Sequence, residues 1–297
     1  MGRVTRPVVV VGDVGIDVLT RPQMPVVHGG EATAHISLVP GGAGGNTAAW
    51  LAARDVDVSL IARIGDDLAG VAARASLESA GVRCVFAVDE ALPTCVVVVL
   101  VDPSGQRSML SDRGASAAFR VEDVRLDVAA GSAAGDAIPH LHLSGYVLFD
   151  AGSRAGGLAA LAGARALGWT TSVDPQTAEL VAEVGAATFL DWVRGVDLLL
   201  PNEIEAEALG GPEAILAAVG QVVVTYGADG ARWFAVDRDE RAAAPAVECI
   251  DSTGAGDAFN AGLLASWLAD AGPQQALRAA VEAGSAAAAG LGARPRS

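Results

Sequence analysis

Short aliphatic runs alternate with longer, alanine-rich stretches along most of the chain. The aliphatic runs contain few polar residues, which is typical of strands that are covered on both faces in a parallel sheet. The stretches between them repeat their apolar residues at helical spacing. These segments lie at 7–13, 46–55, 58–65, 68–81, 138–145, 154–168, 170–175, 195–202, 204–210 and 221–227. The alternation predicts an α/β fold with a mostly parallel central sheet that helices cover on both faces.

Two segments depart from this rhythm and predict a second, smaller sheet. In residues 31–42 apolar residues alternate with more polar ones, which is the period of a strand with one face in water. Residues 93–114 contain two strand-like runs around a turn at 102–105, where Pro and Gly occupy favoured turn positions. We expect a single domain over 1–297 with a small antiparallel lid, whose segments lie at about 14–40 and 92–112.

The charge balance limits the class of partner. The chain has 35 acidic and 20 basic residues, a net charge of −15, which argues against nucleic acids and anionic membranes. A small-molecule substrate stays compatible with this charge. If it carries phosphates, backbone amides, a metal ion and a few arginines must bind them locally. No apolar run is long enough to span a membrane, and the first residues lack a separate cleavage site, so we expect a cytoplasmic protein.

Cysteine and lysine usage exclude several kinds of chemistry. Cys84, Cys95 and Cys249 are widely spaced, with no pair at metal-ligand spacing, and we expect buried, reduced thiols. All basic residues are Arg, because the chain contains no Lys. This excludes phosphate loops that carry a lysine, the strand lysine of protein kinases and Schiff-base catalysis.

The stretch 248–262, ECIDSTGAGDAFNAG, places small residues directly before an apolar helix. Glycines let backbone N–H groups approach a ligand, and the start of a helix attracts anions. Asp257 falls in the first turn of this helix, where the helix dipole favours an ionised carboxylate. An anion hole with a built-in base suits phosphoryl transfer to a hydroxyl group. A tight turn with Asp257 as a helix cap is the alternative interpretation.

Residues 251–257 also match D-[ST]-[ST]-G-A-G-D, the carboxy-terminal signature of ribokinase-like (PfkB) carbohydrate kinases. Four further stretches resemble elements of this family, in the family's order. They are VGDVGIDV (11–18), the glycine-rich segment 40–67, PNEIEAEAL (201–209) and TYGADG (225–230). The resemblance implies a ribokinase-like three-layer α/β/α fold with a small antiparallel β lid.

The resemblance also assigns roles to residues on the phosphate side of the site. It implies Asp257 as the catalytic base and a cofactor requirement for ATP and Mg²⁺. The amides of Gly254, Ala255 and Gly256 would form the anion hole, Asn202, Thr225, Gly227 and Gly230 would bind ATP, and Glu205 would act on Mg²⁺ through water. Asp251 and Thr253 fall where many relatives bind a monovalent cation, which makes K⁺ a further candidate. For Asn202 and Glu205 the alternative is a helix cap with an exposed acid.

On the acceptor side, the resemblance points to residues that grip sugar hydroxyl groups. They are Asp13, Asp17, Gly41, Gly42 and Asn46. The chain departs from ribokinase itself, which has Lys where Ala43 stands and an acidic residue where Ser144 stands. Arg107 and Arg113 lie on or beside the expected lid and would reach a carboxylate or phosphate of the acceptor, or be solvated edge residues.

We therefore expect an ATP-dependent sugar kinase that phosphorylates a hydroxymethyl group. A nucleoside kinase on the same fold is the alternative, although only Phe86 and Phe119 near the lid segments offer aromatic stacking. A sugar- or nucleotide-binding protein without activity is a third interpretation, which an intact Asp257 disfavours. Exposed aliphatic side chains in 95–101 would pair two lids, so we expect a homodimer.

Overall fold

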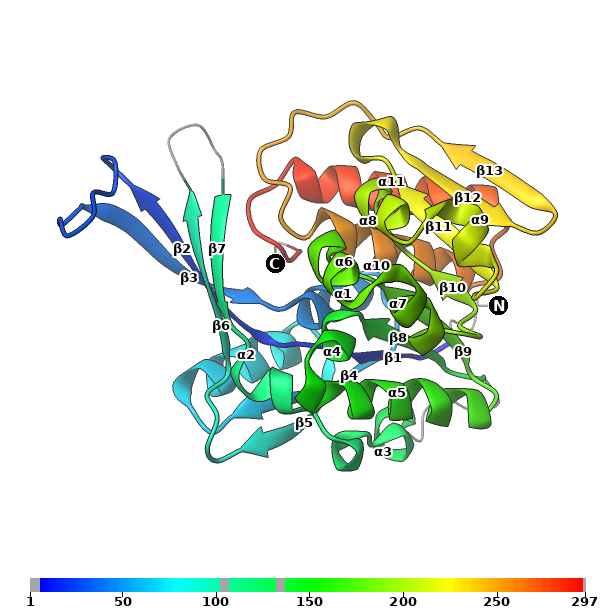
Figure 1. Ribbon diagram of the computed structural model, residues 1–297, viewed down its shortest axis with the longest axis horizontal. Coiled ribbons are helices and arrows are strands. Elements are labelled where there is room, and N and C mark those ends of the chain that lie inside the picture. The colour runs from blue at the N-terminus through cyan, green and yellow to red at the C-terminus, as the bar shows by residue number, and fades with distance from the viewer. Residues whose placement is uncertain (1–5, 102–106, 132–136, 296–297) are drawn as a thin grey trace.

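A sheet of nine strands forms the centre of the molecule (Figure 1). The computed structural model describes residues 6–101, 107–131 and 137–295, with the backbone alone for Arg107. The strands are β1 (Val8–Val11), β4 (Val58–Gly65), β5 (Arg83–Asp89), β8 (His140–Ser144), β9 (Thr170–Asp174), β10 (Leu198–Leu199), β11 (Gln221–Thr225), β12 (Ala231–Ala235) and β13 (Arg238–Ala242). Their order is β13-β12-β11-β10-β9-β8-β1-β4-β5. All neighbours from β5 to β11 are parallel, and β12 and β13 add an antiparallel edge, which confirms the predicted sheet.

Helices cover both faces of this sheet. One layer holds α1 (Ala43–Ala52), α2 (Leu68–Ser79), α10 (Ala255–Trp267) and α11 (Pro273–Ala288). The other holds α3 (Leu126–Ala130), α4 (Tyr146–Phe149), α5 (Ala151–Ala166), α6 (Ala178–Val184), α7 (Ala186–Trp192), α8 (Glu203–Ala208) and α9 (Gly211–Leu216). Short 3-10 turns lie at Gly114–Ala118, Val121–Asp123 and Gly227–Asp229. Within the described residues, no helix combines the length and the apolar character that crossing a membrane requires.

The all-valine strand β1 shows why its sequence lacks polar alternation. Val8 and Val10 pack into the core under α1 and α10, whereas Val9 and Val11 pack into the core on the opposite face. Successive side chains of a strand point to opposite faces, so a strand between two helical layers needs apolar residues at every position. The uncharged runs in the sequence therefore predicted the layered architecture correctly.

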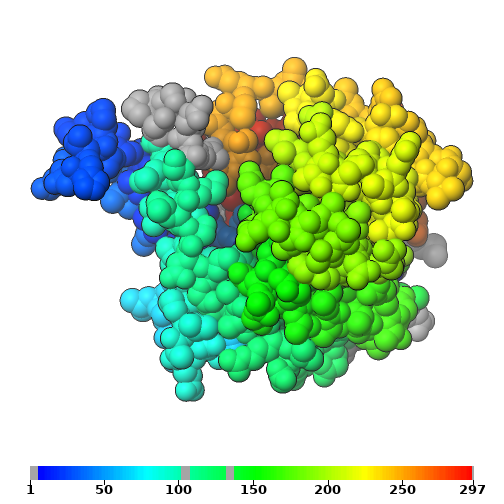
Figure 2. All heavy atoms as spheres, viewed as in Figure 1, coloured from blue at the N-terminus to red at the C-terminus, as the bar shows by residue number. Residues whose placement is uncertain are grey.

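A second sheet of four strands projects from this body (left in Figures 1 and 2). It contains β2 (Gly15–Pro22), β3 (Ala34–Gly41), β6 (Cys95–Val101) and β7 (Arg107–Asp112), in the order β3-β2-β6-β7. The outer pairs are antiparallel, as expected, but the central pair β2–β6 is parallel. The predicted turn at 102–105 lies outside the described residues.

The apolar positions of this sheet form an uncovered face. Ile36 and Leu38 are 63% and 72% exposed, so the alternation in β3 does not produce a buried apolar side. Leu38 stands beside Val18, Val18 beside Val98, and Val98 beside Leu110. Residues that are paired across strands share a face, so these side chains form one continuous apolar row. Large exposed apolar patches often mark interaction sites, so this row is the candidate for one on the small sheet.

The three cysteines are free, as expected, but their burial differs. Cys95 is buried and Cys84 is partly buried. Cys249 is exposed, so the expectation of burial is wrong for this residue.

Two buried histidines form a polar chain inside the main sheet. His140 contacts the hydroxyl groups of Thr170 and Ser172 at 2.9 and 2.8 Å, and His142 contacts the same Ser172 hydroxyl at 2.8 Å. The ring of His140 meets that of Trp267 edge to face. Burial lowers the pKa of His142 to about 4 and that of His140 well below its usual value. Both rings are therefore neutral in the folded protein at neutral pH.

We predict that this burial makes folding sensitive to acid. The unfolded chain protonates His142 below about pH 6.5 and the folded chain does not, so stability is lost as the pH falls through this range. Between pH 7 and 5, wild type should lose about 2 kcal/mol more unfolding free energy than His142→Gln. Wild type must be compared with the variant because buried carboxyl groups with raised pKa values increase the stability as the pH falls. Their effect opposes that of His142 and is the same in both proteins. Urea unfolding at several pH values measures the difference, with exposed His35→Gln as control. Parallel curves for wild type and His142→Gln would contradict the prediction.

Candidate active site

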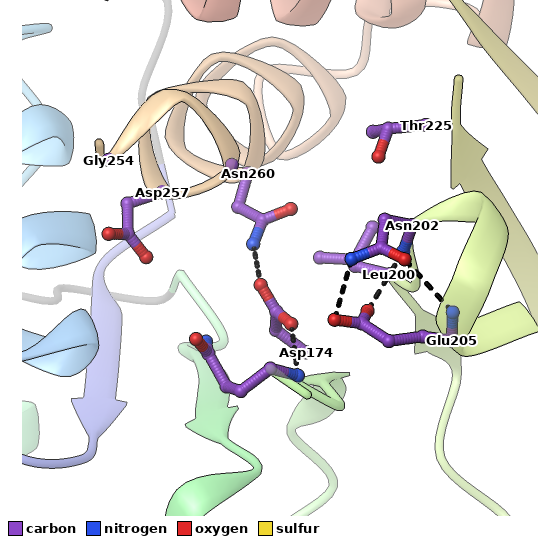
Figure 3. A pocket seen from close by; sticks show the side chains of 10 residues that line it. Asp174, Leu200, Asn202, Glu205, Thr225, Gly254, Asp257 and Asn260 are labelled. Carbon is purple, nitrogen blue, oxygen red and sulfur yellow. Dashed lines mark hydrogen bonds between the residues drawn. The ribbon is translucent and has the colours of Figure 1, made fainter. Parts of the chain in front are cut away.

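A pocket of about 200 Å³ opens where the ends of β9 and β11 and the residues after β10 meet the start of α10. It is lined by Asp174, Gln176, Leu200, Asn202, Glu205, Thr225, Gly254, Gly256, Asp257 and Asn260 (Figure 3). Ligands of open α/β sheets bind at the carboxyl ends of parallel strands. The pocket therefore lies where the topology predicts a site, and it contains most of the residues assigned to the phosphate side.

The turn before α10 requires glycine at its centre. Gly254 adopts φ 74°, and a Cβ atom there would lie 2.4 Å from the carbonyl oxygen of Ala293. Gly254 and Gly256 line the pocket, so backbone at the start of the helix faces it. The amide of Ala255 instead donates to the Ser252 carbonyl at 3.2 Å. Of the three amides assigned to the anion hole, that of Ala255 is thus engaged within the turn.

Asp257 joins α10 to α1. Its Oδ2 accepts a hydrogen bond from Asn46 Nδ2 at 3.0 Å, and its Oδ1 accepts one from Thr47 Oγ1 at 3.2 Å. Burial raises the pKa of Asp257 well above the usual carboxyl value, and the nearby charge of Asp174 adds to this effect. The two hydrogen bonds oppose the rise. A carboxylate with a raised pKa takes up a proton more readily, which is the property that a general base needs.

Asn202 and Glu205 bind each other at the start of α8. Asn202 Oδ1 accepts a hydrogen bond from the backbone amide of Glu205 at 2.9 Å, and Glu205 Oε2 accepts one from the backbone amide of Asn202 at 2.9 Å. Asn202 Nδ2 also donates to Glu205 Oε1 at 2.7 Å. This arrangement is a helix capping box. Glu205 is nevertheless buried in the pocket wall. Its pKa is raised mainly by burial and, to a smaller extent, by the charge of Asp174.

Four lining residues were not predicted from the sequence: Asp174, Gln176, Leu200 and Asn260. Asp174 is the last residue of β9. It accepts hydrogen bonds from Asn260 Nδ2 at 2.5 Å and from the backbone amide of Gln176 at 2.8 Å. Burial raises the pKa of Asp174. In Figure 3 Asp174 lies between the α10 side chains and the Asn202–Glu205 pair. A carboxylate at the end of a predicted parallel strand is the signal that could have identified Asp174.

The acceptor-side residues gather at the junction of the small sheet and α1, outside the pocket lining. Asp13 accepts hydrogen bonds from the amides of Ala43 and Gly44 at 3.2 and 3.4 Å, and from Ser144 Oγ at 3.2 Å. Asp13 therefore anchors the start of α1, and Ser144, one of the departures from ribokinase, supports this anchor.

Asp17 faces the glycine pair that precedes α1. A Cβ atom on Gly41 would lie 2.1 Å from Asp17 Oδ1, so only glycine leaves room for this carboxylate. Gly42 caps α1 with φ 85°. Burial, with the charge of Asp13, raises the pKa of Asp17 to about 6. Asn46 connects this group to the pocket, because its side chain contacts Asp257.

The remaining candidates divide between the pocket and its surroundings. Thr225 lines the pocket, whereas Gly227 and Gly230 form the turn between β11 and β12 and do not line it. The buried carboxylate of Asp251 accepts hydrogen bonds from the amides of Thr253 and Gly292 at 2.9 and 3.1 Å. The loop before α10 and the segment after α11 thus lie side by side.

Comparison with known proteins settles the family. Residues 6–296 match the model of the family described as pfkB family carbohydrate kinase. The chain belongs to this family of carbohydrate kinases. It is 34% identical over 265 residues to an ATP-dependent ribose-1-phosphate kinase of Halopiger xanaduensis, covering 86% of this chain and 82% of that protein. It is 30% identical over 240 residues to a fructokinase of Vibrio alginolyticus, covering 76% of each.

Solved structures confirm the ribokinase-like fold. An adenosine kinase of Sinorhizobium meliloti superposes with a TM-score of 0.84 at 22% identity, covering 98% of this chain and 96% of that one. A ribokinase of Thermotoga maritima gives 0.82 at 22% identity, covering 97% and 94%. Membership of the pfkB family makes the chain a phosphotransferase with an alcohol group as acceptor, as the sequence predicted.

Other predicted groups of this kinase have different surroundings than expected. Arg113 forms an ion pair with Asp150 at 2.5 Å, donates to the Tyr146 carbonyl at 3.1 Å and lies over the Tyr146 ring. It is therefore not a solvated edge residue. The side chain of Arg107 lies outside the described residues. Phe119 is buried in the core, which removes it as a stacking group.

We predict that the Thr47 hydroxyl stabilises the charged form of Asp257. Thr47→Val keeps the shape but leaves this buried carboxylate one donor short, which should lower the unfolding free energy at pH 8 by about 1–3 kcal/mol. The loss should shrink at pH 5, because a protonated carboxyl group needs fewer donors. Urea unfolding at both pH values tests this, with Thr47→Ser as the control that retains the hydroxyl. A loss for Thr47→Val that does not depend on pH would refute the assignment.

Proposed function

We propose that this kinase transfers the γ-phosphoryl group of ATP to a hydroxymethyl group of a small sugar, with Asp257 as the base. The supporting observation is the position of Asp257. Asp257 lines the same pocket as Asn202 and Glu205, and its carboxylate also contacts Asn46 from the predicted acceptor group. A base between the phosphates and the acceptor hydroxyl is the arrangement that direct transfer requires.

The proposed reaction follows from this position. The acceptor oxygen attacks the γ-phosphorus while its proton passes to Asp257, and the bond from this phosphorus to the leaving β-phosphate oxygen breaks to give ADP. Backbone at Gly254 and Gly256 stabilises the transferring phosphoryl group. Asp13, Asp17, Gly41, Gly42 and Asn46 hold the sugar, and Asn202, Thr225, Gly227 and Gly230 border the nucleotide. The small sheet acts as the lid that excludes water.

Mg²⁺ fits the donor set of the pocket. Asp174 and Glu205 are buried carboxylates whose pKa values are raised by burial, for Glu205 also by the charge of Asp174, and no basic side chain lines the pocket within the described residues. A structure from Escherichia coli that superposes with a TM-score of 0.84 was solved with ATP and Mg²⁺. We propose that Asn202 and Glu205 hold the ion through water, where it would neutralise phosphate charge.

K⁺ is the further proposed activator, bound near Asp251 and Thr253. The amide contacts of Asp251 tie the loop before the anion hole to the segment at Gly292. A cation at this junction would stabilise the negative charge of Asp251 and order the turn at Gly254. We propose a cytoplasmic location because the cytoplasm supplies ATP.

A nucleoside acceptor is the second candidate. Tyr146 is an aromatic residue close enough to Asp13, Asp174 and Asp257 for their charges to raise its pKa, with burial as the larger cause. A ring at this place can stack on a base. A relative from Salmonella typhimurium that is 26% identical over 276 residues is an aminoimidazole riboside kinase.

We further propose a homodimer in which the apolar row of the small sheet pairs with that of a second copy. Leu38→Asp should then convert a particle of about twice the 29.8 kDa chain mass into a monomer. Light scattering after gel filtration measures this mass. Val236→Asp, at a position that is 93% exposed on another part of the molecule, is the control. A wild-type monomer would exclude the dimer.

Release of ADP from MgATP tests the activity and identifies the acceptor. We expect one member of a panel of ribose, fructose, ribose 1-phosphate and adenosine to raise the rate well above that without acceptor. Each acceptor is tested with K⁺ and with Na⁺, and a faster rate with K⁺ alone supports the activator site. If no acceptor raises the rate of ADP release in a protein shown to bind ATP, a binding role is favoured over kinase activity on these acceptors.

Asp257→Asn should lower kcat by about a hundredfold to ten-thousandfold, because the amide cannot accept the proton. Folding and ATP binding should remain close to wild type, since Asn has nearly the same shape. Calorimetry with ATP checks the binding. Asp191→Asn, at an exposed position, is the matched control. Activity retained in Asp257→Asn would refute the assignment of the base.

A further inference from the structure

Arg294, in the segment after α11, extends its side chain into the junction behind the acceptor group. Its Nε donates to Asn46 Oδ1 at 3.1 Å, and its Nη2 donates to the Gly41 carbonyl at 2.9 Å. The remaining nitrogen, Nη1, donates to Ser76 Oγ at 3.3 Å. Every nitrogen of the guanidinium group is therefore bonded, so this side chain has one defined orientation.

This arrangement decides which way the Asn46 amide points. A guanidinium group has only donors, so it must face the amide oxygen of Asn46 and not the nitrogen. Asn46 Nδ2 is then directed to the other side, where it donates to Asp257 Oδ2 at 3.0 Å. In the flipped amide, the oxygen would face the carboxylate of Asp257 and the nitrogen would face Arg294. Both contacts would be repulsive, which makes the observed orientation the stable one.

The charge of Arg294 acts on the same group of residues. Burial lowers its pKa to about 10, so it stays positive at neutral pH, and its charge interacts with those of Asp17 and Asp257. The other titratable groups around Asp257 are Asp174 from β9, Asp13 after β1 and Tyr146 from α4. The negative charges of Asp174 and Asp13 disfavour ionisation of Asp257, whereas the positive charge of Arg294 favours it.

We infer that Arg294 is a positioning residue, which orients Asn46 so that its amide holds the carboxylate of Asp257 in the ionised, proton-accepting form. This inference rests on the proposed role of Asp257 as the base. Arg294 itself contacts Asn46, Gly41 and Ser76, and it acts on the reaction through Asn46.

The test compares Arg294→Met and Arg294→Lys with wild type in the ADP-release assay. Arg294→Met removes the donors and the charge, so we expect kcat to fall about tenfold or more while KM for ATP changes less than about twofold. In the plot of kcat/KM against pH, the acid limb should shift to higher pH by about one unit, because Asp257 is then harder to ionise. Arg294→Lys keeps the charge but not the planar fork, so its kcat should be intermediate and its acid limb close to wild type.

Trp50→Phe is the matched control for a merely structural role. Trp50 Nε1 donates to the Ala293 carbonyl at 2.9 Å, so this variant loosens the same segment and removes none of the partners of Arg294. Its kcat and acid limb should match wild type. If Trp50→Phe reproduces the loss seen in Arg294→Met, docking of the segment is the cause and the inference is wrong.

Gly45→Ala keeps the test decisive if Arg294→Met folds poorly. In Gly45→Ala the new Cβ atom would lie 2.6 Å from Arg294 Nη2, which displaces the guanidinium group without removing it. This variant should show the same upward shift of the acid limb. Where Arg294→Met folds, it should lower kcat less in an Asn46→Ala background than in the wild type, because the amide that it orients is gone and only its charge is then lost.

The outcomes separate this inference from the proposed function. An inactive wild type would refute the kinase proposal itself. An active wild type whose kcat and acid limb are unchanged in Arg294→Met and Gly45→Ala would refute the role of Arg294 alone. Additive effects of Arg294→Met and Asn46→Ala would also refute it.

Discussion

The site depends on one buried contact, in which Asn46 and Thr47 donate to Asp257 across 211 and 210 residues of sequence. Burying a carboxylate is costly unless donors surround it, so α1 and α10 must meet at a fixed depth and rotation. Glycines around this contact allow the neighbouring segments to approach closely. Gly254 lets the segment at Ala293 approach the helix start, and Gly41 leaves room for Asp17. The close packing of these backbones therefore follows from the need to supply donors to a single buried carboxylate.

The pocket concentrates negative charge where a polyphosphate must bind. Asp174, Glu205 and Asp257 line it, and burial raises the pKa of each. Burial makes these charges costly, so a bound cation would favour their ionised forms and make the site favourable for ATP. The chain's net charge of −15 points the same way, because the overall field repels the nucleotide and binding must come from local groups. Metal and nucleotide would then bind as one unit.

Much of the fold could be predicted because parallel strands between two helical layers must be apolar throughout. β4 occupies the predicted 58–65, whereas β10 shrinks to Leu198–Leu199, since the Asp197 side chain bonds the Thr171 amide and Pro201 lacks an N–H. The motifs located the site residues that lie within them, from Asp13 to Asp257. Asp174 and Arg294 escaped prediction for a different reason. Their position depends on which strand lies beside β10 and on where the segment after α11 packs, and neither is encoded in local spacing.

The structural and chemical interpretations of the site residues turn out to describe the same hydrogen bonds. Asn202 and Glu205 form a capping box, yet that box fixes Glu205 in the pocket wall. Asp13 accepts hydrogen bonds from the first two amides of α1, and the helix that starts there carries Asn46 to Asp257. The start of a helix exposes amides that need acceptors, and a side chain that satisfies them is held rigidly. A site built from helix starts therefore gains its preorganisation from the interactions that also begin its helices. Evidence that a residue is a cap is thus no argument against a role in the reaction.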